Sequence, residues 1–163
     1  MGSGTEVYYS ANGEVIKLRD GRLVGSAGLP VDWREVRQAS PPDWLTLARG
    51  RSSASEPSNY ARERDVMPGY RYGLREAMTV RGIPALPRSV AGIRGDSLSW
   101  FEESSRSLDA AAALPPARFA VLVSSADARV LYSEQCLSAG VCLSFETWPP
   151  LAGAAADAEG RSR

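Results

Sequence analysis

The chain has 163 residues, of which 44% are apolar, and its 19 basic and 19 acidic side chains cancel. This length and composition suit a single domain with a true core, and the charge balance gives no field that would attract nucleic acid. The chain contains no histidine. Ser–His hydrolases, papain-like enzymes and His-bearing zinc sites are therefore excluded, and we expect no cofactor, no metal and no nucleic-acid partner.

The first segment predicts a three-stranded meander. Its strands span residues 7–10, 14–19 and 22–24, and the dipeptides Asn12-Gly13 and Asp20-Gly21 separate them. Both dipeptides accept the positive φ angles of a tight hairpin turn. Since neighbouring side chains on a strand point to opposite faces, we expect at least one of Tyr8 and Tyr9 to be buried. We also expect this first strand to lie at a sheet edge.

Less regular structure is predicted further along the chain. Asp32 followed by Glu35 is a spacing that can cap a short helix. Residues 40–59 are rich in Pro, Ser, Gly and Ala, which predicts a mobile loop anchored by Trp44, Leu45 and Leu47. We expect disorder at residues 51–58, and we expect order to return at Pro68.

Six further elements follow from hydrophobic pattern and turn residues. The segment 68–73 predicts a turn that leads into a strand ending near Gly82 and Pro84. The alanine-rich run 108–114 predicts about two helical turns before Pro115. The other expected strands cover residues 98–101, 119–123, 129–133 and 141–146, the middle two as a hairpin.

These elements define a mainly β fold, an antiparallel meander sheet or partly closed β-barrel with one or two short helices. We expect one β domain over residues 1–150 and a disordered tail at 151–163. No apolar stretch approaches the roughly 20 residues that cross a bilayer, so no transmembrane span is expected. The first residues lack the pattern of an export signal.

Three segments in this order resemble landmarks of one family. Residues 7–30 contain Tyr8-Tyr9-Ser10-Ala11-Asn12-Gly13, and residues 68–73 and 132–137 follow as Pro-Gly-Tyr-Arg-Tyr-Gly and Tyr-Ser-Glu-Gln-Cys-Leu. Together they resemble the YjbF/GfcB family of capsule and exopolysaccharide lipoproteins. The resemblance implies a β-barrel-like domain that is lipid-anchored at the periplasmic face of the outer membrane.

The same resemblance implies a non-catalytic accessory or assembly role in making and exporting capsule or exopolysaccharide. Its partners would be export or assembly proteins of the envelope, and also the polysaccharide itself. Members of the family begin with a signal peptide, a lipidated cysteine and further strands. Because the given chain starts directly at the first hairpin, we expect it to be truncated at its N-terminus. An exposed first strand would also allow a homodimer through pairing of identical edges.

Cys136 and Cys142 are the only two cysteines. With the family placed outside the cytoplasm, we expect them to form a disulfide that closes a short turn. The alternative is a pair of reduced core cysteines in a cytosolic protein.

Two rival functions remain open. A glycan-binding module would use aromatic rings for sugar stacking, and Tyr70, Tyr72 and Trp100 are the candidate contacts, although core packing also explains such residues. An enzyme acting on the polysaccharide would need a carboxylate pair. Glu102 and Glu103 are adjacent on a strand and face opposite ways, so they cannot flank one glycosidic bond, and we expect no enzyme.

Overall fold

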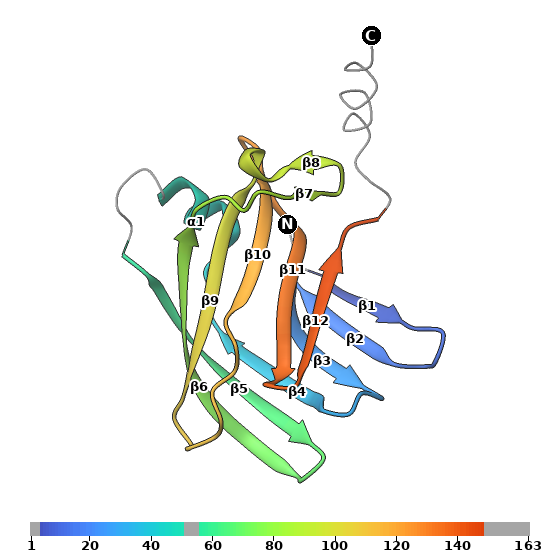
Figure 1. The fold of residues 1–163 in the computed structure, drawn as a ribbon. Coiled ribbons are helices and arrows are strands. Elements are labelled where there is room, and N and C mark those ends of the chain that lie inside the picture. Colours follow the sequence, from blue (N-terminus) through green and yellow to red (C-terminus); the bar gives the residue numbers. More distant parts are fainter. Residues whose placement is uncertain (1–3, 51–55, 149–163) are drawn as a thin grey trace.

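The structure is a computed structural model that describes residues 4–50 and 56–148. Its strands form antiparallel sheets of three, seven and two strands (Figure 1). The small sheet consists of β1 (Thr5–Tyr9), β2 (Val15–Arg19) and β3 (Arg22–Ala27). The two-stranded sheet pairs β7 (Ser89–Val90) with β8 (Ile93–Arg94).

The large sheet is a meander that curls into a half-barrel. In chain order its strands are β4 (Asp32–Ala39), β5 (Ser58–Met67), β6 (Arg71–Ile83), β9 (Ser99–Ser107), β10 (Ala117–Val123), β11 (Ala128–Ser138) and β12 (Val141–Glu146). Consecutive members pair along the whole sheet, apart from the excursion through β7 and β8. The predicted mainly β, meander architecture is confirmed.

The core has two sides, because the large sheet is covered on both faces. Its inner face is the one turned toward the three-stranded sheet and helix α1 (Trp44–Gly50). There Trp33, Leu23 and Leu137 form one cluster, and Trp44 packs on Phe119 with ring centroids 4.8 Å apart. The outer face carries a third cluster around Trp100 beneath the β7–β8 hairpin and the short 3-10 helix Gly95–Ser97.

The first three strands confirm the sequence prediction, with Gly13 and Gly21 both at positive φ in the two turns. The first strand lies at the edge of its sheet, as expected. The expected burial of Tyr8 or Tyr9 is wrong, since the side chains are 50% and 75% exposed. All five residues of β1 are exposed, so no described element covers either face of this strand fully.

The helix predicted at Asp32 is wrong, because that segment is strand β4. Its apolar residues Trp33 and Val36 are buried by packing on the three-stranded sheet. The Asp32 carboxylate instead accepts hydrogen bonds from Ser26 Oγ at 2.9 Å and from the Gly28 amide at 2.8 Å. It therefore stabilises the turn between β3 and β4 rather than a helix end.

The mobile loop predicted at 40–59 is also wrong over most of its length. Helix α1 begins after Asp43, whose carboxylate accepts a hydrogen bond from the Thr46 amide at 2.9 Å. The expected apolar anchor is confirmed, because Trp44 is 4% exposed. Strand β5 begins at Ser58, ten residues before the expected return of order at Pro68. Most of the predicted disorder, at residues 51–55, lies outside the described residues. The predicted tail at 151–163 lies outside them as well.

The helix predicted at 108–114 is wrong as well. Ala110 has a φ of 54°, which lies outside the helical region. Asp109 accepts a hydrogen bond from the Arg75 amide at 2.6 Å, and the Leu108 amide donates to the Arg75 carbonyl at 2.9 Å. These contacts hold the segment as an irregular connection along β6. The strand predictions at 98–101, 119–123, 129–133 and 141–146 are confirmed, and no helix in the described ranges is long and apolar enough to cross a membrane.

Candidate functional site

Charged side chains lie on the inner face of the large sheet, where a β protein usually buries apolar ones. Arg22 at the start of β3 donates from Nε to Glu103 Oε2 at 2.8 Å, and both side chains are 3% exposed. Tyr60 Oη donates to the other carboxylate oxygen of Glu103 at 3.0 Å. The Arg22 guanidinium also lies over the Trp44 ring, 4.0 Å from its centroid.

A second buried cluster joins β5 to β6. Glu76 accepts hydrogen bonds from Arg62 at 2.7 Å and from Arg64 at 3.0 and 3.1 Å. Both guanidinium groups lie 4.8 Å from the Trp33 ring centroid. These three side chains are 8% exposed or less, so they do not belong to a solvated charged surface.

The pKa values of the cluster follow from burial and pairing. Desolvation alone would raise the pKa of Glu76, but the charge of Arg62 and the hydrogen bonds from both arginines outweigh it, so the pKa is lowered. The pKa of Tyr60 is raised, first by burial and then by the charge of Glu103. Both buried carboxylates are thus bound by arginine, which suits a structural role better than proton transfer.

The Glu102 and Glu103 carboxylates lie on opposite faces of β9, as the sequence predicted. Glu103 points inward to Arg22, whereas Glu102 accepts from Arg81 Nη2 at 2.6 Å on the outer side. No cluster of three or more metal-ligating side chains occurs among the residues that the structure describes.

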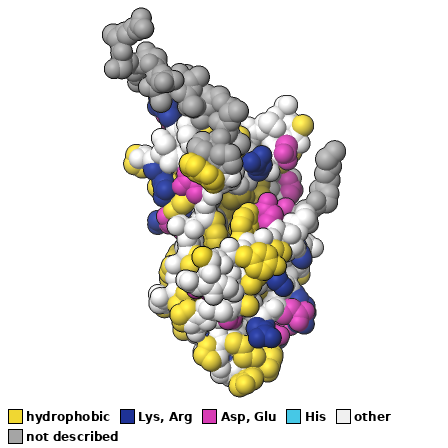
Figure 2. Space-filling view, turned by 90° about the vertical axis from the view of Figure 1, so that its right-hand side faces the viewer, with side chains coloured by type: hydrophobic (Ala, Val, Ile, Leu, Met, Phe, Trp, Pro, Cys, Tyr) yellow, Lys and Arg dark blue, Asp and Glu magenta, His cyan; other side chains and the backbone are white. Residues whose placement is uncertain are grey.

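A cleft of about 780 Å³ opens between the three-stranded sheet and the ends of β11 and β12, and we call it the open cleft. Figure 2 shows this side of the molecule as hollowed, with hydrophobic side chains in the hollow and acidic ones beside it. Its lining combines aromatic rings with charged and hydroxyl groups. The lining includes Glu6, Tyr8, Leu18, Asp20, Arg129, Val130, Tyr132, Ser133, Ser144, Phe145, Glu146, Thr147 and Trp148.

The strand pattern explains how the walls of the open cleft form. Glu6 and Tyr8 lie opposite Leu18 and Ile16 of β2, so they share the face of the small sheet that looks into the core. Across the cleft, Phe145 lies opposite Ser133 and packs on the same core cluster. Trp148, just past β12, is 84% exposed at the rim.

Glu6, Arg129 and Phe145 were not predicted from the sequence as site residues. The alternation of Glu6 with Tyr8 and of Leu143 with Phe145 indicates which face each occupies. The meeting of the first strand with the last is a property of the curled sheet, and no local signal predicts it.

The predicted glycan contacts do not form one site. Tyr70 and Tyr72 are 76% and 62% exposed at the turn between β5 and β6, where Met67–Pro68 is a cis peptide bond. Trp100 is wrong as a contact, because it has no exposed surface and its Nε1 donates to the Gly95 carbonyl at 2.8 Å. It packs under the β7–β8 hairpin on the outer face of the sheet.

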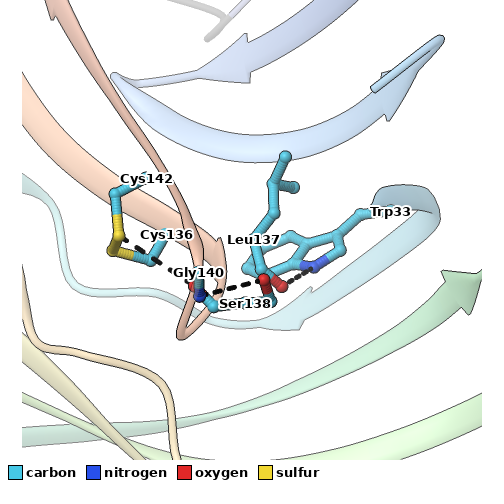
Figure 3. The surroundings of a disulfide bond; sticks show 6 residues. All are labelled: Trp33, Cys136, Leu137, Ser138, Gly140 and Cys142. Atoms are coloured by element: carbon cyan, nitrogen blue, oxygen red, sulfur yellow. Dashed lines mark hydrogen bonds between the residues drawn. A yellow bond between two sulfur atoms is a disulfide. The ribbon is translucent and has the colours of Figure 1, made fainter. Parts of the chain in front are cut away.

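The two cysteines form the expected disulfide (Figure 3). Cys136 and Cys142 are directly opposite each other on β11 and β12, with Cα atoms 3.9 Å apart. Between them, the Leu137 carbonyl accepts a hydrogen bond from Trp33 Nε1 at 3.0 Å. The disulfide therefore closes a turn that is also attached to the core through Trp33.

The structure thus defines a mainly β protein of the half-open, antiparallel type, with arginine-bound buried carboxylates and an aromatic-lined cleft. The family described as "Group 4 capsule polysaccharide lipoprotein gfcB, YjbF" matches residues 2–86, just over half of the chain. The protein belongs to this YjbF family, and the resemblance predicted from the sequence is confirmed.

A solved structure agrees with the fold. The crystal structure of the hypothetical lipoprotein YmcC from Escherichia coli (K12) is similar, with a TM-score of 0.65 and 18% sequence identity. The similarity covers 93% of this chain and 77% of that one. No curated protein sequence matches the chain. Family membership therefore supports a capsule-related role at the envelope, and the structural neighbour supports the shared architecture.

Proposed function

We propose that the protein is a non-catalytic accessory or assembly protein of capsule or exopolysaccharide production and export. The observation that carries this proposal is the match of residues 2–86 to the capsule polysaccharide lipoprotein family. The proposed location is the periplasmic face of the outer membrane, where export and assembly proteins of the envelope would be its partners. An oxidising compartment of this kind also suits the Cys136–Cys142 disulfide.

The arrangement of carboxylates supports a role without catalysis. Glu76 and Glu103 are each bound by arginine in the core, and Glu102 faces away from Glu103. A glycosidase needs two carboxyl groups facing one bond at about 5–9.5 Å, one of them free to protonate the leaving group. Ion pairing with arginine opposes that protonation.

The test for catalysis is incubation of the purified protein with capsule polysaccharide, followed by chain-length analysis and a reducing-end assay. We expect unchanged chain length and no new reducing ends. Cleavage that disappears in a single Asp or Glu variant would instead establish the carboxylate enzyme. Membrane fractionation of cells tests the proposed location, since the protein should separate with the outer membrane.

The open cleft favours a second candidate function, direct binding of the glycan. Pyranose rings pack their apolar face on aromatic side chains while hydroxyl groups bond to polar neighbours. The cleft offers Tyr8, Phe145 and Trp148 together with Glu6 and Arg129. Its volume lies within the 300–1,000 Å³ that is usual for small-ligand sites.

Tryptophan fluorescence tests this second function, because Trp148 is 84% exposed whereas Trp33, Trp44 and Trp100 are 4% exposed or less. Titration with oligosaccharides from the strain's own capsule should change the emission saturably. Tyr8→Ala should weaken binding at least about tenfold, given the usual size of aromatic contacts. Tyr72→Ala, an exposed tyrosine outside the cleft, is the control, and equal losses in both variants would refute the cleft as the site.

A further inference from the structure

The outer face of the large sheet is covered only in part by the rest of the described chain. The β7–β8 hairpin packs over one row of cross-strand neighbours, which are Ile83 of β6, Trp100 of β9 and Ala120 of β10. The next row on the same face lies two residues further along each strand, because side chains alternate between faces. That row is charged and consists of Arg81, Glu102 and Arg118.

A single carboxylate joins the two arginines of this row. Glu102 accepts a hydrogen bond from Arg81 Nη2 at 2.6 Å through Oε1, and its Oε2 lies 3.8 Å from Arg118 Nε. The Glu102 side chain is 14% exposed, whereas those of Arg81 and Arg118 are 62% and 47% exposed. Each guanidinium carries five N–H donors, so both arginines retain donors for a further acceptor.

The same face continues along β6 and β9, away from the β7–β8 hairpin. Thr79 lies opposite Ser104, and Arg106 follows two residues after Ser104. Ser104 and Arg106 are both exposed, and Arg106 forms no ion pair with any residue that the structure describes. Arg106 is four residues from Glu102, a distance of about 13 Å along the strand. We call this surface the arginine face, defined by Thr79, Arg81, Glu102, Ser104, Arg106 and Arg118.

The arginine face has an excess of positive charge, with three arginines and one glutamate. Other carboxylates on this side of the sheet are paired elsewhere, Glu35 and Glu63 with Arg37, and Asp109 with Arg75. Exposed ion pairs add little to stability, so the fold does not require this arrangement. The exposed guanidinium groups are therefore available to an anionic ligand.

We propose that the arginine face binds a glycan chain that carries carboxylate groups. The inference rests on the proposed function and deepens it, because it names the chemical class of the polymer. Guanidinium and carboxylate groups match as planar forks that form two parallel hydrogen bonds. The glycan carboxylates bind Arg81, Arg106 and Arg118, while its hydroxyl groups bond to Thr79 and Ser104 between them.

The composition of the arginine face favours a glycan over other anionic partners. The core of a protein interface is rich in aromatic and apolar side chains, and contact with a lipid surface uses apolar side chains that insert into it. The six residues of the arginine face include neither kind. Only the small side chains of Thr79 and Ser104 lie between Arg106 and the charged row, so an extended polymer has room to lie across the strands.

Isothermal titration calorimetry of the full chain with oligogalacturonic acid tests the proposal, in about 0.1 M salt, where the Debye length is about 10 Å. We expect saturable binding that weakens as salt is added, and no binding of a dextran oligomer of matched length, which lacks carboxylates. Arg81→Gln and Arg118→Gln should each weaken binding about two- to fivefold, the usual effect of one exposed ion pair. Glu102→Gln should tighten it, because this variant removes the carboxylate that competes for both arginines.

Arg37→Gln is the matched control, because Arg37 is 58% exposed on the same side of the sheet but lies in register with Glu63 and Arg75. It should bind like the unaltered protein, and near-UV circular dichroism should be the same for all variants. Absent or dextran-like binding would overturn the proposal. So would equal affinities of Arg81→Gln and Arg37→Gln, or weaker binding by Glu102→Gln. Because the assay uses isolated protein and a defined glycan, its failure would leave the capsule role to be judged separately by gene deletion.

Discussion

At the scale of single residues, the inner face of the sheet depends on charge pairs that lie away from water. Isolated buried charges are costly, and a buried pair is stable only when its hydrogen bonds are complete. Glu76 meets this condition through Arg62 and Arg64, and Glu103 through Arg22 and Tyr60. These charge pairs explain why strand β5 was not predicted. Its inward-facing positions are Tyr60, Arg62, Arg64 and Val66, and two arginines among four positions are typical of a solvent-exposed segment.

Glu76→Gln should lower the free energy of unfolding by about 3 kcal/mol or more, because it leaves two buried arginines without their counter-charge. Urea denaturation measures the change. The control is Glu63→Gln, whose carboxylate pairs with Arg37 at the surface with a side chain 37% exposed. That change should cost about 0–1 kcal/mol, and equal losses in the two variants would contradict a special role for the buried cluster.

The same carboxylate predicts a pH dependence of stability. The pKa of Glu76 in the folded protein lies below its ordinary value of 4.5. Its ion pairs therefore stabilise the fold above about pH 4.5, and this stabilisation is lost as the pH falls through the folded pKa. The unaltered protein should therefore lose stability below about pH 4.5 more steeply than Glu76→Gln does. Denaturation curves between pH 7 and pH 3 provide the comparison, and parallel losses would contradict the assignment.

At the scale of elements, turn chemistry and hydrophobic pattern each placed strands correctly. Asn12-Gly13 and Asp20-Gly21 correctly placed the first two hairpins, and Gly21 has no room for a side chain because Val130 lies against it. Two of the errors involve aspartates whose hydrogen bonds do not cap a helix. Asp32 stabilises a turn rather than a helix end, and Asp109 bonds to Arg75 on another strand.

The disulfide belongs to this scale, since it links β11 to β12 beside their turn. Closing so short a loop should stabilise the fold by about 2 kcal/mol, as estimated from the chain entropy of the unfolded state. Urea denaturation with and without dithiothreitol measures the effect. The double variant Cys136→Ser with Cys142→Ser should have the stability of the dithiothreitol-treated protein in both conditions. If reduction breaks the disulfide but leaves the free energy of unfolding unchanged, the estimate is contradicted.

At the scale of the whole molecule, the sequence predicted the fold class and the family but not the shape of the candidate site. Family membership rests on residues 2–86, whereas the open cleft is completed by β11, β12 and Trp148. Its two walls come from opposite ends of the chain and meet only because the large sheet curls. Of the proposed glycan contacts, Trp100 is in the core, and Tyr70 and Tyr72 lie on a separate turn.

The central claim is that this YjbF-family protein serves capsule or exopolysaccharide production without catalysing a reaction on the polymer. The most direct test deletes its gene in the native strain, restores either the unaltered gene or a Glu102→Gln variant, and quantifies surface and intracellular polysaccharide. We predict that deletion lowers surface polysaccharide and that both genes restore it, because Glu102 lies in an outer-face ion pair with Arg81. Unchanged surface polysaccharide after deletion would contradict the account.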